Sequence, residues 1–320
     1  MADTPGSRIL VTGALGQIGT ELTEALRERY GADAVVASDV RDLPDHPCVL
    51  GGPYRNLSVI DADAFDRVVV EEGIGTVYHL AAILSAAGEK KPELCERINV
   101  GGTVTVLEVA RNHSLRVYAP SSIAVFGPDA PKHAPQECAL NPTTMYGQTK
   151  VTGERLAMNY WKQYGVDVRG IRYPGLVSYK APAGGGTTDY AVDIFHHALK
   201  NGHYDCFVRG DTRLPMMYMD DAIRATIALM DAPVEAIGTA RGGYNLSGCS
   251  FTATELAEAV GARVPGFTCD FLPDVRQKYA DSWPDSVDDE AAQSDWGWDA
   301  EYDLDAMCDA MIAGLQSSSI

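Results

Sequence analysis

The stretch Arg8-Ile-Leu-Val-Thr-Gly-Ala-Leu-Gly-Gln-Ile-Gly-Thr20 joins an apolar segment to a glycine-rich turn. Residues 8–12 are mostly β-branched or apolar, which predicts a short buried strand. From Thr20 to Tyr30 apolar residues recur with a helical period, so a helix follows the turn. Glycines let a ligand approach the backbone, while the free amides and the dipole of the helix attract an anion. The stretch therefore predicts a pyrophosphate site that opens a dinucleotide-binding fold. Its expected contacts are Gly13, Gly16, Gln17, Ile18 and Gly19.

A second predicted strand, residues 34–39, ends in the carboxylate of Asp39, about 20 residues past the last glycine. In a dinucleotide-binding fold that position accepts hydrogen bonds from the adenosine ribose, and an anion there repels a 2′-phosphate. The sequence therefore favours NAD over NADP. Arg41 could instead accept that phosphate, but stacking on the adenine or a solvated position is the preferred interpretation.

Strands and helices alternate with short links through the first half of the chain. This alternation predicts an α/β fold with a doubly wound parallel Rossmann sheet, whose ligands lie beyond the carboxyl ends of the strands. We expect residues 1–175 with about 215–242 to form the NAD-binding domain. Residues of about 176–214 and 243–320 would form a smaller, interleaved C-terminal substrate-binding lobe.

Several of these expected elements can be given bounds. Strands are expected at residues 76–82, 116–120 and 166–173, and helices at residues 146–160, 190–199, 252–260 and 304–315. A glycine-rich loop at residues 182–189 precedes the second of these helices. Asn99 is expected to open a helix, residues 214–221 to introduce another, and Thr252 to cap the helix that follows it. The further expected cofactor contacts are Asn56, Leu57, Leu80, Ala81, Ala82, Asn99, Tyr173 and Leu176.

Tyr146 and Lys150 are one helical turn apart, so the phenol and the ammonium lie on one face of the predicted helix. A tyrosine, whose ordinary pKa is about 10, is a poor base at neutral pH unless a neighbouring cation favours the phenolate. Ser122, at the end of a strand, can orient a substrate hydroxyl. The three residues predict oxidation of an alcohol with Tyr146 as general base. Lys150 would lower the pKa of Tyr146 and would also contact the nicotinamide ribose.

The composition excludes several classes of protein. The net charge is −18, from 44 acidic and 26 basic residues without a basic tract, which makes nucleic-acid binding improbable. No apolar run approaches the length of a membrane span. Seven scattered cysteines without a C-x-x-C pair predict reduced thiols in a cytoplasmic protein, and no clustered ligand set implies a metal. The N-terminus lacks a signal core, although a trimmed organellar precursor stays open.

The glycine loop, Asp39, Ser122 and the Tyr146/Lys150 pair resemble the extended short-chain dehydrogenase/reductase superfamily. More narrowly, segments along nearly the whole chain are similar to the short-chain type L-threonine 3-dehydrogenases. These segments are Gly16-Gln-Ile-Gly-Thr-Glu-Leu22, Pro120-Ser-Ser-Ile-Ala-Val-Phe126, Pro174-Gly-Leu176, Gly184-Gly-Gly-Thr-Thr-Asp-Tyr-Ala191, Leu214-Pro-Met-Met-Tyr-Met219 and Asp281-Ser-Trp-Pro284. The last three lie outside the cofactor fold and are the more specific ones.

The resemblance implies oxidation of the L-threonine C3 hydroxyl to 2-amino-3-oxobutanoate, with NAD as the oxidant. It implies that Tyr146 is the base, that Lys150 lowers its pKa, and that Ser122 binds the substrate hydroxyl. The superfamily further suggests a homodimer through the 146–160 helix and its neighbour. The residues implied to close on the substrate are Ser85, Gly184, Thr187 and Trp283, although Thr187 could be a helix cap and Trp283 a core aromatic.

Two other functions stay open on the sequence. A nucleotide-sugar epimerase or dehydratase would use the same serine, tyrosine and lysine, and would need a diphosphate anchor such as Arg209 or Arg213. A catalytically silent, NAD-sensing regulatory protein is the third interpretation, and the intact set of three residues disfavours it.

Overall fold

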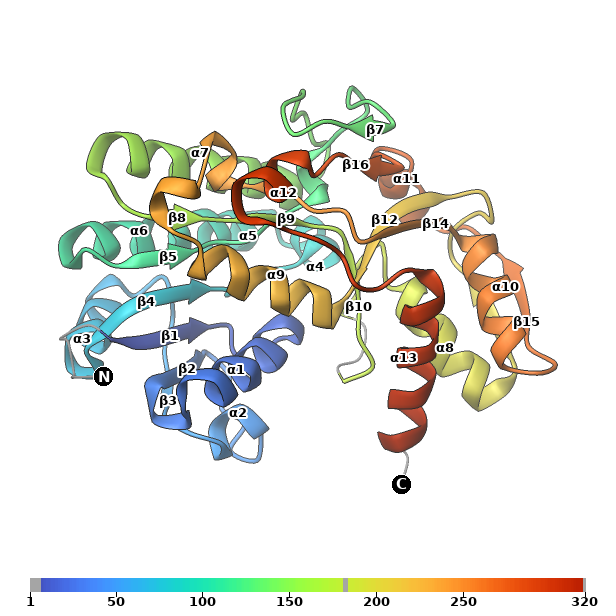
Figure 1. The fold of residues 1–320 in the computed structure, drawn as a ribbon, viewed down its shortest axis with the longest axis horizontal. Helices are drawn as coiled ribbons and strands as arrows, with labels where there is room; N and C mark the ends of the chain where they lie inside the picture. The colour runs from blue at the N-terminus through green and yellow to red at the C-terminus, as the bar shows by residue number, and fades with distance from the viewer. Residues whose placement is uncertain (1–6, 181–183, 319–320) are drawn as a thin grey trace.

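The computed structural model describes residues 7–180 and 184–318, so Pro182 and Ala183 of the predicted glycine-rich loop lie outside the described residues. A six-stranded parallel sheet, in the order β3-β2-β1-β4-β5-β8, forms the N-terminal part of the molecule (Figure 1). The predicted doubly wound Rossmann sheet is thereby confirmed. Its strands are β1 Arg8–Thr12, β2 Val35–Asp39, β3 Tyr54–Asn56, β4 Ile74–His79, β5 Arg116–Tyr118 and β8 Val168–Arg169.

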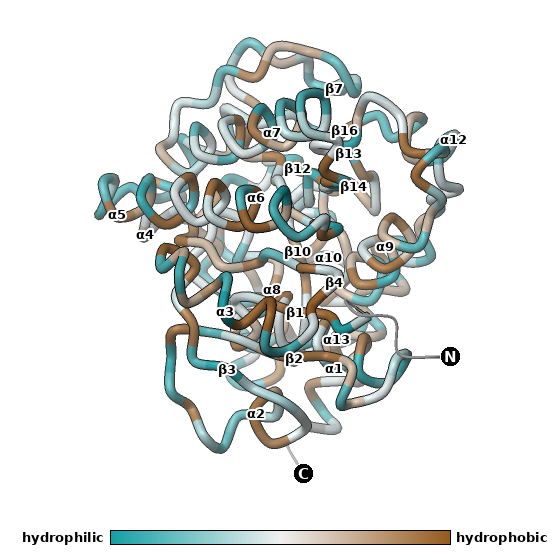
Figure 2. Tube along the Cα trace, turned by 90° about the vertical axis from the view of Figure 1, so that its left-hand side faces the viewer, coloured by the Kyte–Doolittle hydropathy of each residue, from teal (hydrophilic) through white to brown (hydrophobic). Residues whose placement is uncertain are grey.

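Helices cover both faces of this sheet because successive side chains of a buried strand point to opposite sides. Ile9 and Val11 of β1 belong to the same apolar cluster as residues of α1 and α9, whereas Leu10 clusters with α3, α6 and α7. The α6 and α7 coils alternate between hydrophilic and hydrophobic residues in Figure 2, as helices with one buried face do. These helices are α1 Gln17–Tyr30, α3 Ala62–Glu72, α6 Gly102–His113, α7 Met145–Tyr164 and α9 Met219–Asp231.

A second region packs around its own apolar core beside the sheet, where Figure 1 shows α8, α10 and α13 together. It contains the mixed sheet β10-β12-β14 and the strand pair β11-β15. Thr252 caps α10 in a capping box with Glu255, which confirms the predicted cap. The elements are β10 Gly175–Val177, α8 Tyr190–Asn201, β11 His203–Cys206, β12 Arg213–Tyr218, β14 Cys249–Thr252, α10 Ala253–Arg263, β15 Thr268–Phe271 and α13 Leu304–Ser318.

Shorter elements complete the chain. Strand β9 pairs with β6 and β13 in a small sheet of its own, and β16 pairs with β7. The shorter elements are α2 Pro47–Leu50, α4 Ser85–Lys90, α5 Pro92–Glu96, β6 Ser121–Ser122, β7 His133–Ala134, β9 Ile171–Tyr173, β13 Tyr244–Asn245, α11 Arg276–Ala280, β16 Ser286–Val287 and α12 Glu290–Trp296.

Two predicted segments, one strand and one helix, differ from the observed structure because of contacts with residues that are remote in sequence. The expected strand 166–173 is split at Gly170, where the backbone turns from β5 to hydrogen-bond with Arg241 and Tyr244. Of residues 214–221, expected to introduce a helix, those up to Tyr218 belong to strand β12, and helix α9 starts at Met219.

A third difference concerns the helix that was expected to open at Asn99. Helical structure begins at Pro92 and runs on to His113, because proline is well suited to a first helical turn. Asn99 therefore lies inside this helical stretch. The four helices expected with bounds are confirmed as α7, α8, α10 and α13, with ends that differ by a few residues.

Every helix within the described residues is too short or too polar to cross a lipid bilayer.

Candidate active site

A cavity of about 550 Å³ lies at the carboxyl ends of β1, β2 and β4 and extends to the glycine-rich loop before α8. Most residues predicted from the sequence line this one cavity, although they come from both regions of the molecule. They are Gly13, Gly16, Gln17, Ile18, Gly19, Asp39, Arg41, Leu57, Leu80, Ala81, Ala82, Ser85, Ser122, Tyr146, Lys150, Tyr173, Leu176, Gly184, Thr187 and Trp283.

Two predicted cofactor contacts, Asn56 and Asn99, are not among the described residues that line it. The Asn56 amide donates to the Val40 carbonyl at 3.2 Å and thereby holds the loop after β2. Asn99 accepts from the Ile83 amide at 2.8 Å and donates to the Ile83 carbonyl at 3.0 Å. Both residues therefore support loops that form the wall, instead of facing the cavity.

The glycine loop fits a pyrophosphate. Gly13 has φ +67°, and a Cβ there would lie 2.7 Å from the Ala81 amide nitrogen, so a side chain at this position would be both strained and crowded. The N-cap of α1 is Gly16, which offers no side-chain hydrogen bond, and the first turn holds no acidic residue. The amides at this helix N-terminus are thus left to an anionic ligand.

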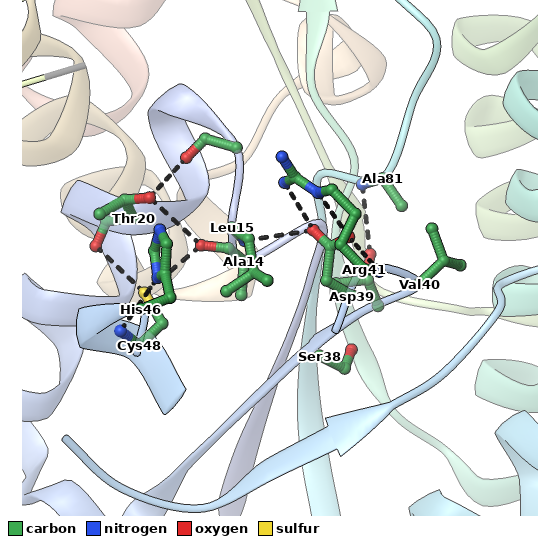
Figure 3. A network of polar contacts seen from close by, with 12 residues as sticks. Ala14, Leu15, Thr20, Ser38, Asp39, Val40, Arg41, His46, Cys48 and Ala81 are labelled. Atoms are coloured by element: carbon green, nitrogen blue, oxygen red, sulfur yellow. Dashed lines mark hydrogen bonds and ion pairs between the residues drawn. The ribbon is translucent and has the colours of Figure 1, made fainter. Parts of the chain in front are cut away.

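Asp39 is held at the end of β2 by two neighbours (Figure 3). The Arg41 guanidinium donates to both carboxylate oxygens at 3.0 Å, and the Leu15 amide donates to one of them at 3.2 Å. Burial raises the pKa of Asp39, but these hydrogen bonds outweigh it and leave the pKa below its ordinary value. Arg41 is therefore engaged with the carboxylate that was predicted to select NAD.

Tyr146 and Lys150 lie at the start of α7, whose N-terminus is fixed by a hydrogen bond from the Gly147 amide to the Thr144 hydroxyl at 3.1 Å. The Lys150 ammonium lies 5.6 Å from the centre of the Tyr146 ring. The predicted pair is thus brought together, and Ser122 of β6 lines the same cavity as the tyrosine.

Burial dominates the electrostatics of this pair. Desolvation in the cavity wall raises the pKa of Tyr146 to about 12, while the Ser122 hydroxyl acts in the opposite direction. Burial likewise lowers the pKa of Lys150 to about 8. The protein by itself therefore does not show the lowered pKa that was expected of Tyr146. The physical reason is that a buried site disfavours the charged form of each group more than the two groups support one another.

The substrate-facing residues answer two alternatives left open by the sequence. Thr187 is buried and lines the cavity, and the N-cap of α8 is Asp189, so Thr187 is not the helix cap. The Asp189 carboxylate accepts from the amides of Gly185 and Gly186 at 2.6 Å each, which braces the loop. Trp283 packs into the apolar core and also lines the cavity, so its core position does not remove it from the site.

Sequence reasoning missed two groups that brace this site. Glu89 of α4 accepts from the Met145 amide at 2.6 Å, which ties the segment after Ser85 to the start of α7. Glu154 lies on α7 one turn beyond Lys150 and is buried. The spacing of Glu154 along the helix is a signal that could have identified it, whereas nothing in the sequence marks Glu89.

The structure also assembles a group that the sequence does not cluster. His203, Asp205 and Asp270 place potential metal-ligand atoms within 4.8 Å of one another on β11 and β15, with their side chains partly or largely exposed. This group is separate from the residues that line the cavity.

Comparison with known proteins agrees with this geometry. Residues 9–247 match the model of the NAD dependent epimerase/dehydratase family. The mitochondrial L-threonine 3-dehydrogenase of Bos taurus is 44% identical over 307 residues, which are 95% of this chain and 82% of that protein.

Solved structures give the same picture. A monomeric L-threonine 3-dehydrogenase from a metagenome database, in its apo form, superposes with a TM-score of 0.93 at 50% identity, over 98% of this chain and 100% of that one. The GalE-like L-threonine dehydrogenase of Cupriavidus necator, in its holo form, has a TM-score of 0.93 at 49% identity, over 96% of this chain and 99% of that one. The resemblance stated from the sequence is confirmed, and the chain belongs to the NAD dependent epimerase/dehydratase family as an enzyme of the extended short-chain dehydrogenase/reductase type.

Proposed function

We propose that this protein oxidises the C3 hydroxyl of L-threonine to 2-amino-3-oxobutanoate, with NAD as the hydride acceptor. One observation carries the proposal: Ser85, Thr187 and Trp283 share a single cavity with Ser122 and Tyr146. The first three residues lie where a small polar substrate would be enclosed, and the last two where its hydroxyl would react. The L-threonine dehydrogenases among the similar proteins support the choice of substrate.

The chain's own residues would bind NAD at the glycine loop, at Asp39 and at Lys150. NAD, when bound, supplies the carbon that accepts the hydride. The uncapped N-terminus of α1 would hold the pyrophosphate, and the Asp39 carboxylate would accept from the adenosine ribose. Because Arg41 already pairs with both oxygens of Asp39, the arginine would have to leave that carboxylate before it could meet a 2′-phosphate.

In the proposed reaction Ser122 and Tyr146 hold the substrate hydroxyl between them. The hydroxyl proton passes to Tyr146 as the C3–H bond breaks, the two electrons of that bond leave as hydride, and the C3–O bond becomes a carbonyl. The positive charge of Lys150 stabilises the phenolate that accepts the proton. Burial makes this charge more effective, since a low-dielectric site weakens ionic interactions less than water does.

The alternative, a nucleotide-sugar epimerase or dehydratase, needs a cation to hold the diphosphate. Both candidate arginines are engaged elsewhere. Arg209 donates to the two carboxylate oxygens of Asp281 at 3.1 and 2.7 Å, and Arg213 donates to those of Glu255 at 2.7 and 2.9 Å. Neither arginine is among the described residues that line the cavity, which favours a substrate without a diphosphate.

A substrate panel tests the proposal. The purified protein with NAD should form NADH steadily from L-threonine, more slowly from L-allo-threonine and D-threonine, and not from UDP-glucose or UDP-galactose. Tyr146→Phe, which keeps the ring but removes the hydroxyl, should lower kcat by about 10²–10⁴-fold. Conversion of a UDP-sugar without NADH formation from L-threonine would contradict the proposed function.

We further propose that residues 1–175 with about 215–242 bind NAD, and that the remaining segments bind the substrate. We also propose that the protein is cytoplasmic and that it takes part in amino-acid catabolism. The homodimer through α7 stays a prediction, because one of the similar structures is described as monomeric.

A further inference from the structure

The segment that leads into β6 contacts the two predicted catalytic residues of α7. The Ser122 hydroxyl acts on the pKa of Tyr146 and lines the same cavity, and the Pro120 carbonyl accepts from the Lys150 ammonium at 2.8 Å. The residue between these two contacts is therefore placed against the same face of the helix.

That residue, Ser121, donates its hydroxyl to the Glu154 carboxylate at 2.5 Å. Tyr146, Lys150 and Glu154 follow one another at intervals of one helical turn, so the helix presents them as a row. Glu154 is thus the third member of the row that contains the predicted base and its cation.

A small cavity lies between Glu154 and Lys150. It has a volume of about 30 Å³, large enough for one water molecule, and both residues line it together with polar groups from Asn99 and Ser121. Because both residues line this one small cavity, little solvent can screen the interaction between the carboxylate and the ammonium.

The Glu154 carboxylate is fixed in place by an arginine. Its side chain is 9% exposed, and Arg172 of β9 donates to its two oxygens at 2.8 Å each. Arg172 in turn donates to the side-chain oxygen of Asn245 at 3.1 Å, so groups from α7, β9 and β13 hold the pair.

We propose that Glu154 is a positioning residue of the reaction, which keeps Lys150 in its charged form across this small cavity and is moderated by its partner Arg172. The proposal rests on the proposed function only in assigning a catalytic benefit to the charge of Lys150. A charged lysine is needed because only the ammonium, and not the neutral amine, stabilises a phenolate at Tyr146.

The other described groups around Lys150 do not supply this negative charge. Burial lowers the pKa of His79 on β4 to about 3, with the charge of Lys150 contributing, so this residue is neutral in any ordinary assay. Burial raises the pKa of the Cys95 thiol on α5, and the thiol is therefore uncharged at neutral pH. Burial raises the pKa of Tyr146 as well. Cys95 and then Glu154 are the groups that raise the pKa of Lys150 against the effect of burial, and Glu154 is the one of the two with a carboxylate.

The direct test is the titration of Lys150 in the cofactor-free protein. The NMR signal of its side-chain Cε, in lysine-labelled protein, would be assigned by its loss in Lys150→Met and followed against pH. Glu154→Gln keeps the shape and an acceptor for Ser121 but removes the charge, so the midpoint should fall by about one pH unit. Glu154→Asp keeps the charge and should stay near the wild-type midpoint.

The second measurement is kcat for L-threonine across the same pH range. In Glu154→Gln a smaller fraction of the molecules has a charged Lys150 at a given pH. The kcat of this variant should therefore fall about fivefold at pH 8, and the descending limb of its pH profile should shift to lower pH. A purely structural residue would lower kcat by the same factor at every pH and would leave the Lys150 midpoint unchanged. That result would overturn the proposal.

A second variant, which should shift the Lys150 midpoint in the opposite direction, tests the proposal if Glu154→Gln does not fold. Arg172→Gln leaves Glu154 with an amide partner but without a neutralising charge, so the Lys150 midpoint should rise. An unchanged or lower midpoint in Arg172→Gln would contradict the proposal. If the wild type fails to oxidise L-threonine, the proposed function falls, while the NMR titration still decides the role of Glu154.

Discussion

Lys150 is a partly buried cation that the chain keeps at a cost in stability. Its pKa of about 8 in the folded protein lies below the ordinary value of 10.5 because burial disfavours the ammonium. Between these two values the unfolded chain binds more protons than the folded one, so this residue makes the protein more stable as pH rises through that window. At neutral pH the charged lysine therefore destabilises the fold that uses it.

Replacing Lys150 with methionine should consequently stabilise the protein and inactivate it. At pH 7 the free energy of unfolding, from urea titration, should rise by about 1–3 kcal/mol, less whatever the lost hydrogen bond to Pro120 contributes. The difference from wild type should shrink by pH 10, where the wild-type lysine is neutral in the folded state. Destabilisation at pH 7, or an equal effect at both pH values, would show that burial of this charge is not what limits stability.

Asp39 should decide the choice of cofactor. Asp39→Asn removes the anion that we propose binds the adenosine ribose, and it frees Arg41 from a bidentate ion pair. We expect kcat/KM for NAD to fall about tenfold and the ratio of NADP to NAD use to rise, because a charged hydrogen bond is lost and a guanidinium becomes available. Initial rates with each cofactor measure this ratio. The exposed neighbour Asp42 provides the control, since Asp42→Asn should leave the ratio unchanged.

The first turn of helix α7, which contains the proposed base Tyr146, is held tightly against the loop after β6. A Cβ at Gly147 would overlap the Ala124 carbonyl oxygen, so this glycine permits the close approach. Gly153, on the same helix, has open space where a Cβ would be. Alanine substitutions at these two glycines therefore distinguish the effect of close packing from the effect of helix propensity.

Gly147→Ala should destabilise the protein by about 1–3 kcal/mol through overpacking and should lower kcat, because Tyr146 is the adjacent residue. Gly153→Ala should stabilise it by about 0.5–1 kcal/mol, the usual gain from replacing glycine within a helix. Urea unfolding of both variants measures the difference. Equal effects of the two substitutions would mean that the contact at Gly147 does not position the helix.

The elements show which parts of the fold local sequence determines. Strand β1, the glycine turn, α1 and the Thr252 cap were predictable, because period and capping chemistry are local. The break at Gly170 was not, since it depends on backbone hydrogen bonds to Arg241 and Tyr244, far along the chain. Strand β12 was missed for the same reason: its partners β10 and β14 are remote in sequence.

Some features of the candidate site, too, were predictable from the sequence, whereas others depend on the assembled fold. The types and spacing of Ser122, Tyr146 and Lys150 were readable from the sequence because their chemistry follows from residue identity. The direction of the Tyr146 pKa shift was not readable, since burial is a property of the assembled fold. Asn99 was assigned to the cofactor, but the fold turns its amide toward the Ile83 backbone.

The whole molecule carries a net charge of −18, which makes its surface self-repelling. Exposed ion pairs such as Arg276 with Asp274 are each worth little, so the excess of like charge should dominate the response to salt. The thermal midpoint in 1 M NaCl should exceed that in 10 mM NaCl by about 3 °C or more, because salt screens the repulsion. Potassium chloride should raise the thermal midpoint to the same extent as sodium chloride. A thermal midpoint that falls with salt would show that attraction within ion pairs outweighs repulsion between like charges.

The two regions of the molecule meet at one cavity, and there, we propose, the C3 carbon of L-threonine gives up hydride. L-Threonine carrying deuterium at C3 tests this most directly, with the reduced cofactor analysed by mass spectrometry. Transfer of hydride from C3 predicts one deuterium in each molecule of NADH formed. Reduced cofactor without deuterium, or no reduction at all, would contradict the claim.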